Sequence, residues 1–268
     1  MRVLILGEGK SGTTALLRSV ATALTNPIEL FEPVQLERDD VAAEPLVVKK
    51  LLMNWNEAEL ELVRDFDGRV FIARDPRDRL ISHLLYDAYN RAHLLSPKRR
   101  KRWLDILATK SEKPQSVTFV ELLNKWWKYS RQDLLSQHVR AMDRTRRFLA
   151  FQGDQFHRFT YEQYVDGDFS QIDNYLGLSL GKATVTGEEK RVARSGTYGD
   201  WRMWFAPSDL RVLRPMMHVG LKIQGYDKKD WELTKVASID PATSVDYVKA
   251  LFDRRPVAAG RSSTRKGS

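Results

Sequence analysis

A glycine-rich segment constrains the fold of this chain more than any other feature. Residues 7–14 read GEGKSGTT; they follow the short apolar run 3–6, and a helical pattern covers residues 13–24. Glycines permit a tight turn whose backbone N–H groups point inward, and a helix N-terminus adds free donors and a partial positive charge that favour phosphate. The segment predicts a strand–loop–helix unit that binds an anion. By itself it also fits an ordinary glycine-rich turn before a helix.

Short apolar runs and helical patterns alternate through the following part of the chain. Further strands are predicted at 28–31, 46–52, 70–73, 147–151 and 157–160, and further helices at 56–64, 76–89, 98–109 and 117–142. This alternation predicts an α/β fold with a doubly wound, mostly parallel sheet flanked by helices, like that of P-loop NTPases. Ligands of such sheets bind at the carboxyl ends of the strands.

The domain organisation follows from length and charge. The 268 residues suit one large α/β domain, which we expect over residues 1–252 with a helical insertion at 83–146. Residues 253–268 are predicted to form a basic, flexible tail, since 254–268 hold five Lys/Arg and no acid.

Composition excludes several classes of protein. The chain has no cysteine, which rules out disulfides, thiolate catalysis and thiolate metal sites. No apolar stretch approaches the roughly 20 residues of a membrane span, and the first apolar run is too short for a signal peptide, so we expect a cytoplasmic protein.

The formal net charge of +9 leaves three interpretations open. Residues 96–113 add seven Lys/Arg against two acids. These charges fit a solvated helix face, a surface for nucleic acid or acidic glycan, or a pocket for a small molecule with several negative charges.

Two later segments have the residues to bind anions. Residues 74–82 read RDPRDRLIS after a predicted strand, so Arg74 and Ser82 can reach one anion near the start of the next helix. A charged, capped helix start explains the same pattern, and Asp75 and Asp78 are expected to act as helix-start charges. Residues 191–201 read RVARSGTYGDW, which fits either a flexible basic binding loop or an ordinary surface loop.

In this order, the three segments resemble the sulfotransferases that use 3′-phosphoadenosine 5′-phosphosulfate (PAPS). Residues 10–14 match their 5′-phosphosulfate loop, 74–82 their 3′-phosphate motif and 194–201 their late Arg-x-Gly-x-x-Gly-Asp-Trp segment. Tyr161-Glu162 looks like an element of the family that lies near adenine. The matches span residues 3–205, about three quarters of the chain.

The resemblance implies a role for each matching residue. PAPS and its product 3′-phosphoadenosine 5′-phosphate (PAP) would be held by Lys10, Ser11, Gly12, Thr13 and Thr14 at the 5′ end, by Arg74, Ser82, Arg194, Ser195 and Gly196 at the 3′ end, and by Tyr161 at the base. Departures from the family are Gly9 where Pro is common, Ala15 where cytosolic relatives have an adenine-stacking Trp, and Ser195 where Lys is common.

The catalytic residues expected from this resemblance are Lys10 and Glu32. In-line transfer requires neutralisation of the charge on the leaving phosphate, a task that suits Lys10. Cytosolic relatives have a catalytic His after the third strand, which this chain lacks; residues 31–34, FEPV, look like an element of carbohydrate sulfotransferases in which Glu acts as base. Glu32 could equally form an ion pair with Lys49 or Lys50, and His83 is the other candidate base.

The expected reaction is sulfonate transfer to a hydroxyl, with an amine as the alternative, of a small-molecule or glycan acceptor, with residues 83–146 forming the acceptor region. No metal is expected, because no cluster has metal-ligand spacing. The alternatives are a P-loop kinase using ATP and magnesium, whose lysine would directly precede Ser/Thr after the last glycine, and a non-enzymatic protein that binds nucleotides or nucleic acid. We expect no specific binding of nucleic acid.

Overall fold

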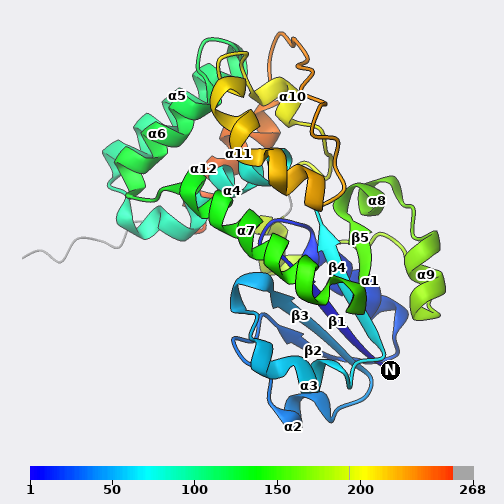
Figure 1. Cartoon of the computed structure of the whole chain (residues 1–268). Helices are drawn as coiled ribbons and strands as arrows, with labels where there is room; N and C mark the ends of the chain where they lie inside the picture. Colours follow the sequence, from blue (N-terminus) through cyan, green and yellow to red (C-terminus); the bar gives the residue numbers. More distant parts are fainter. Residues whose placement is uncertain (193, 256–268) are drawn as a thin grey trace, which may run out of the picture.

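A computed structural model of the chain describes residues 1–192 and 194–255, and within them five strands form one sheet (Figure 1). The strands are β1 (Arg2–Gly7), β2 (Ile28–Phe31), β3 (Leu46–Leu51), β4 (Gly68–Ala73) and β5 (His157–Thr160). Their order is β2-β3-β1-β4-β5, and every neighbouring pair is parallel. The predicted doubly wound α/β fold is confirmed.

Helices cover both faces of the sheet. They are α1 (Thr13–Ala23), α2 (Arg38–Val41), α3 (Leu60–Val63), α4 (Pro76–Arg91), α5 (Pro97–Glu112), α6 (Phe119–Ser130), α7 (Leu134–Gln152), α8 (Tyr161–Asp166), α9 (Ser170–Leu176), α10 (Trp201–Trp204), α11 (Leu210–Ile223) and α12 (Val245–Asp253). Side chains alternate along β1, so that Val3 and Ile5 pack with α1, α8 and α9, whereas Leu4 and Leu6 pack with α2, α3 and α7.

A helical lobe lies beyond the carboxyl ends of the strands (Figure 1). Its core joins residues of α4, α5, α6, α7, α10, α11 and α12 and includes five buried tryptophans, Trp103, Trp126, Trp201, Trp204 and Trp231. Since α4 follows β4 directly, its first turn lies at the boundary between lobe and sheet. Residues 256–268 of the predicted basic tail, and residue 193, lie outside the described residues.

Two predicted elements between residues 117 and 151 differ from the structure. The predicted strand 147–151 is wrong, because these residues form the last turns of α7. Ala141, Met142, Thr145, Phe148 and Leu149 are buried along one face of that helix, a period near 3.6 that a local β-like run concealed. The helix predicted at 117–142 is two helices, since Arg131 adopts a left-handed conformation (φ 60°) and Asp133 caps α7.

A buried ion pair fixes the chain that follows β2. Lys50 is fully buried on β3, and its Nζ donates to Glu59 Oε1 at 3.0 Å and to the carbonyl of Val34 at 2.8 Å. Glu59 is also buried, at the end of a 3₁₀ turn (Glu57–Glu59). One lysine therefore holds the segment after Glu32 against the sheet.

We expect Glu59→Ala to lower the free energy of unfolding by about 3 kcal/mol or more, because it leaves the Lys50 ammonium buried without its counter-charge. The double variant Lys50→Met/Glu59→Leu removes both charges and should lose less. Chemical denaturation followed by circular dichroism measures both. Asp105→Ala, which breaks the exposed pair of Lys101 and Asp105, is the control and should cost less than about 1 kcal/mol; an equal loss in Glu59→Ala would contradict the assignment.

Candidate active site

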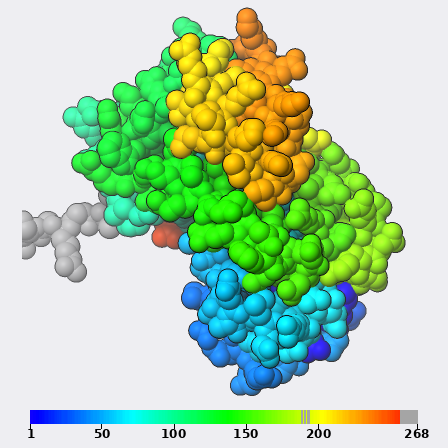
Figure 2. Space-filling view, viewed as in Figure 1, coloured from blue at the N-terminus to red at the C-terminus, as the bar shows by residue number. Residues whose placement is uncertain are grey.

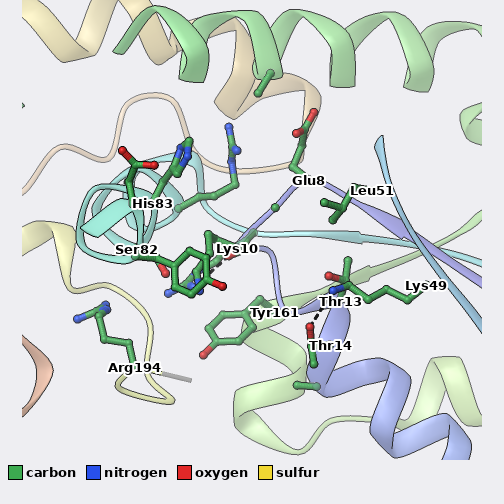
Figure 3. Close-up of a pocket in the computed structure, with 18 of the residues that line it drawn as sticks. Glu8, Lys10, Thr13, Thr14, Lys49, Leu51, Ser82, His83, Tyr161 and Arg194 are labelled. Atoms are coloured by element: carbon green, nitrogen blue, oxygen red, sulfur yellow. Dashed lines mark hydrogen bonds between the residues drawn. The ribbon is translucent and has the colours of Figure 1, made fainter. Parts of the chain in front are cut away.

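A cavity of about 950 Å³ lies at the carboxyl ends of the strands, between the sheet and the helical lobe. Its walls come from the loop after β1, the first turn of α1, the ends of β2 and β3, α4, α7, α8 and the segment 194–196. Figure 3 shows Lys10 near the centre, with Ser82 and His83 on one side and Tyr161 on the other. Segments far apart in the sequence thus share one cavity.

The loop after β1 has a backbone that depends on glycine. Gly12 has φ 94°, and a Cβ there would lie 2.6 Å from the Tyr161 ring, so this position tolerates no side chain. Ser11 turns inward, and its Oγ donates to the carbonyl of Glu8 at 2.7 Å. The N–H groups at the start of α1 follow directly, as an anion site requires.

Arg74 joins this loop to the start of α4. It is buried at the end of β4, donates to the Lys10 carbonyl at 3.2 Å, and lies over the Tyr161 ring at 4.1 Å. Ser82, on the second turn of α4, lines the same cavity. The spacing between Arg74 and Ser82 therefore brings both side chains to one place, as the sequence predicted.

Two aspartates position the late loop. Asp200 accepts hydrogen bonds from Arg194 and from the hydroxyls of Ser195 and Thr197. Asp78, on the first turn of α4, accepts from the backbone N–H of Gly199 at 2.5 Å and of residue 201 at 3.0 Å. The expectation that Asp78 is merely a helix-start charge was incomplete, because it anchors the loop that carries Arg194; Asp75 is the N-cap of α4.

Positive charge is concentrated in this cavity. Burial, followed by the charges of Arg74 and Arg194, holds the pKa of Lys10 well below its ordinary value. The Lys10 ammonium lies 3.9 Å from the centre of the Tyr86 ring, a cation–π geometry. A polyanion in the cavity would relieve the repulsion among these cations.

Glu32 lies at the end of β2 and faces Lys49 on the neighbouring strand. Lys49 is buried and donates to Glu32 Oε1 at 2.5 Å and to Thr14 Oγ1 at 2.9 Å. Burial lowers the pKa of Lys49, while the hydrogen bond and charge of Glu32 act in the opposite direction. Both side chains line the cavity, so the ion pair predicted for Glu32 is present within the candidate site.

His83 also lines the cavity instead of lying on an outer helix face. Burial, and then the charges of Arg79 and Lys10, lower its pKa to about 3. The imidazole is therefore neutral near pH 7 and is a weak proton acceptor. This disfavours His83 as the general base.

The structure brings nearly all of the predicted site residues together. Lining the cavity are Lys10, Gly12, Thr13, Thr14, Glu32, Arg74, Ser82, Tyr161, Arg194, Ser195 and Gly196, with Ala15 beside them. Ser11 differs, because its hydroxyl closes the loop and does not line the cavity.

Sequence reasoning missed several neighbours of these residues. Lys49 was considered only as a partner for Glu32, and Tyr86 was not considered at all. The signal for Lys49 was present, because a lysine at the end of a buried strand needs a reason to be there. Nothing local could have identified Tyr86, whose contact with Lys10 depends on the docking of α4.

The basic patch at 96–113 lies elsewhere. Its residues belong mainly to α5, and none of them lines the cavity. Two of its cations are buried: Arg100 donates to the carbonyls of Ala92 and Phe252, and Lys110 to those of Pro114 and Val117. The patch is partly structural, not wholly a solvated face.

Polar side chains line the end of the cavity that the helical lobe forms. They come from α4, from the α6–α7 turn and from α7, and they are Asp87, Asn90, Arg91, Gln132, Gln137, Arg140 and Arg144. Arg91 donates to Gln132 at 2.6 Å, and Arg144 forms an ion pair with Glu8 at 2.7 Å. This end offers both donors and acceptors to a polar molecule.

Two further searches concern only residues 1–192 and 194–255. Within them, no three His, Asp or Glu side chains gather in a group that could hold a metal ion. None of the helices there combines the length and hydrophobicity that crossing a membrane requires.

Comparison with known proteins reveals a structural relative. No family model and no curated protein sequence matches this chain. Among solved structures, it is similar to mouse sulfotransferase SULT7A1 complexed with PAP, with a TM-score of 0.52 and 16% identity over 84% of this chain and 89% of that one. This chain has the sulfotransferase fold.

The free energy of unfolding should fall as pH rises, because the buried Asp78 carboxyl loses its proton. Burial raises its pKa from 3.8 to about 7, so the folded protein retains a proton that the unfolded chain releases between those values. The contribution is fully present below about pH 4 and is lost as pH rises through about 7. Asp78→Asn cannot titrate, so its stability deficit against the parent should shrink from pH 5 to pH 8 in chemical denaturation without nucleotide.

Asp133→Asn provides the control for this measurement. The pKa of Asp133, lowered by its hydrogen bonds with Ser136, lies below the tested range, so its deficit should not change with pH. A constant deficit for Asp78→Asn would show that Asp78 is ionised throughout.

Proposed function

We propose that this protein is a PAPS-dependent sulfotransferase that transfers a sulfonate group to a hydroxyl, less readily an amine, of a carbohydrate or similar polar acceptor. One observation carries the proposal: side chains from the segments 10–14, 74–82 and 194–196, far apart in the sequence, line one cavity in a chain with the fold of a PAP-bound sulfotransferase. Each segment alone fits a commonplace structural role, whereas their convergence on one cavity fits a ligand with phosphates at two ends.

The residues present fit such a ligand. The Nε atoms of Arg74 and Arg194 are buried and have no hydrogen-bond partner among the described residues, which is costly unless a ligand supplies an acceptor. The absence of a side chain at position 12 lets the Tyr161 ring pack directly against this loop. Arginine donors at one end and a helix N-terminus with Lys10 at the other suit two phosphate groups.

The chemistry assigned to the protein is mainly electrostatic. When bound, PAPS supplies the activated sulfonate. Lys10 would neutralise the charge that develops on the 5′-phosphate side, while Thr13 and Thr14 orient that end. Arg74, Ser82 and the Arg194 loop would hold the 3′-phosphate, and Tyr161 would flank the base.

Glu32 is our candidate for the general base. Its carboxylate lines the cavity close to the loop after β1. Lys49 donates one hydrogen bond to this carboxylate, which holds it in place, and a second to Thr14. The resemblance of residues 31–34 to an element of carbohydrate sulfotransferases supports a carbohydrate-type enzyme over an aryl-type one. The polar lining contributed by α4 and α7, within residues 83–146, would receive the acceptor.

Binding of PAP tests the proposal directly. In calorimetry, PAP should bind tightly and ATP with magnesium weakly, and Lys10→Ala and Arg74→Ala should each weaken PAP binding by about tenfold or more, since each removes a charged hydrogen-bond donor. Arg64→Ala is the control: Arg64 is exposed and outside the cavity, so this variant should bind PAP as the parent does. ATP binding equal to or tighter than PAP binding would favour a kinase instead.

Turnover tests the assignment of the base. Glu32→Gln should bind PAP normally yet lose at least about a hundredfold in PAP release from PAPS with a panel of sugar acceptors, because a positioned base contributes that much. Glu29→Gln, a change on the same strand outside the cavity, should retain turnover. Full activity in Glu32→Gln would assign proton removal to another group.

A further inference from the structure

A second hollow lies next to the candidate active site. Its volume is about 700 Å³, and it is bounded by α7 on one side and by residues 52–57 on the other. Figure 2 shows α7 in green crossing this face of the molecule, with the blue N-terminal part below it. Arg140 and Arg144 line both hollows, so the cavity and this outer groove adjoin each other at these two side chains.

One stripe of α7 runs along both hollows. Gln137, Arg140 and Arg144 line the cavity, and Arg140, Arg144, Arg147 and Phe151 line the groove. Their spacing of three or four residues puts them on one face of the helix. From 137 to 151 the helix rises about 21 Å, which is longer than a monosaccharide.

The outer end of this stripe combines an exposed aromatic ring with charge. Phe151 is 78% exposed, and Trp55, from the opposite wall, packs edge-to-face against Phe148 of α7, so the two walls of the groove meet there. Arg147 is 65% exposed and pairs with Asp143. Aromatic faces suit sugar rings, while arginines suit carboxylate or sulfate groups.

We propose that the groove is a binding subsite for an acidic oligosaccharide, whose reacting end enters the cavity while the rest of the chain lies along α7. This deepens the proposed function and rests on it, since it names the class of acceptor. Arg140 and Arg144 contact the sugar nearest the cavity, Arg147 binds an acidic group further out, and Trp55 and Phe151 contact ring faces.

The charge balance of the groove favours this occupant over nucleic acid. The described residues that line it include three arginines, but also the carboxylates of Glu57 and Asp143. A nucleic acid carries a charge on every residue and would be repelled by both carboxylates. Sugar hydroxyls donate hydrogen bonds to carboxylates, and an acidic oligosaccharide spaces its charges more widely.

Calorimetry with defined oligosaccharides tests the subsite, using the full chain with and without PAP. The probes are a disaccharide and a hexasaccharide of alternating glucuronic acid and N-acetylglucosamine, and the same hexasaccharide with its carboxyl groups reduced. We expect the acidic hexasaccharide to bind about tenfold more tightly than either other probe, because only it reaches Arg147 with a charge.

Variants at the outer end separate the subsite from the cavity. Arg147→Ala and Phe151→Ala should weaken hexasaccharide binding by about tenfold and leave disaccharide and PAP binding unchanged. Arg146→Ala is the matched control, because Arg146 also pairs with Asp143 but does not line the groove. It should bind the hexasaccharide as the parent does.

Several outcomes would overturn the subsite: equal binding of the reduced hexasaccharide, equal losses in Arg146→Ala and Arg147→Ala, no binding of any uronate probe, or tighter binding of a single-stranded hexanucleotide. PAP titrations keep the two proposals distinct. Normal PAP binding with no oligosaccharide binding would refute the subsite alone, and oligosaccharide binding without PAP binding would refute the sulfotransferase proposal while retaining the groove.

Discussion

Repulsion among buried positive charges is the constraint on which the carboxyl edge of this sheet depends. Unlike in water, cations in a protein interior interact strongly over several ångströms. The fold reduces this repulsion by pairing cations with acidic side chains from other segments. Lys49 pairs with Glu32, and Arg144 pairs with Glu8. Arg74 lies over an aromatic ring. These contacts hold the side chains at one cavity, where the proposed anionic ligand would complete the balance.

The sequence predicted the sheet well because each strand carries its own signal. The bounds of β2 and β5 agree with those predicted, since each is a short run that ends where a different local pattern begins. The error at 147–151 arose because these five residues, taken alone, fit a strand pattern. The helical period of buried residues becomes visible only over the longer segment that forms α7. Strand order requires contacts between segments, which one sequence does not contain.

Site residues that belong to short contiguous motifs were predictable from the sequence, whereas residues that depend on contacts between distant segments were not. Gly12 and Arg74 belong to contiguous motifs that reflect a turn and a helix start. Asp78, by contrast, meets a loop more than a hundred residues later, and no local pattern announces that contact. Burial is likewise a property of the whole fold, which is why the weak basicity of His83 could be read only from the structure.

Helix α7 has a buried side that packs in the core and an exposed side that lines the groove. Its buried face packs Phe148 and Leu149 against the sheet, whereas Arg147 and Phe151 beside them are exposed to solvent. Substitutions along the outer stripe therefore leave the core untouched. A descendant of this protein could change the surface of the groove while retaining its fold and its cavity, which would make α7 the natural place for the proposed acceptor specificity to diverge or to be redesigned.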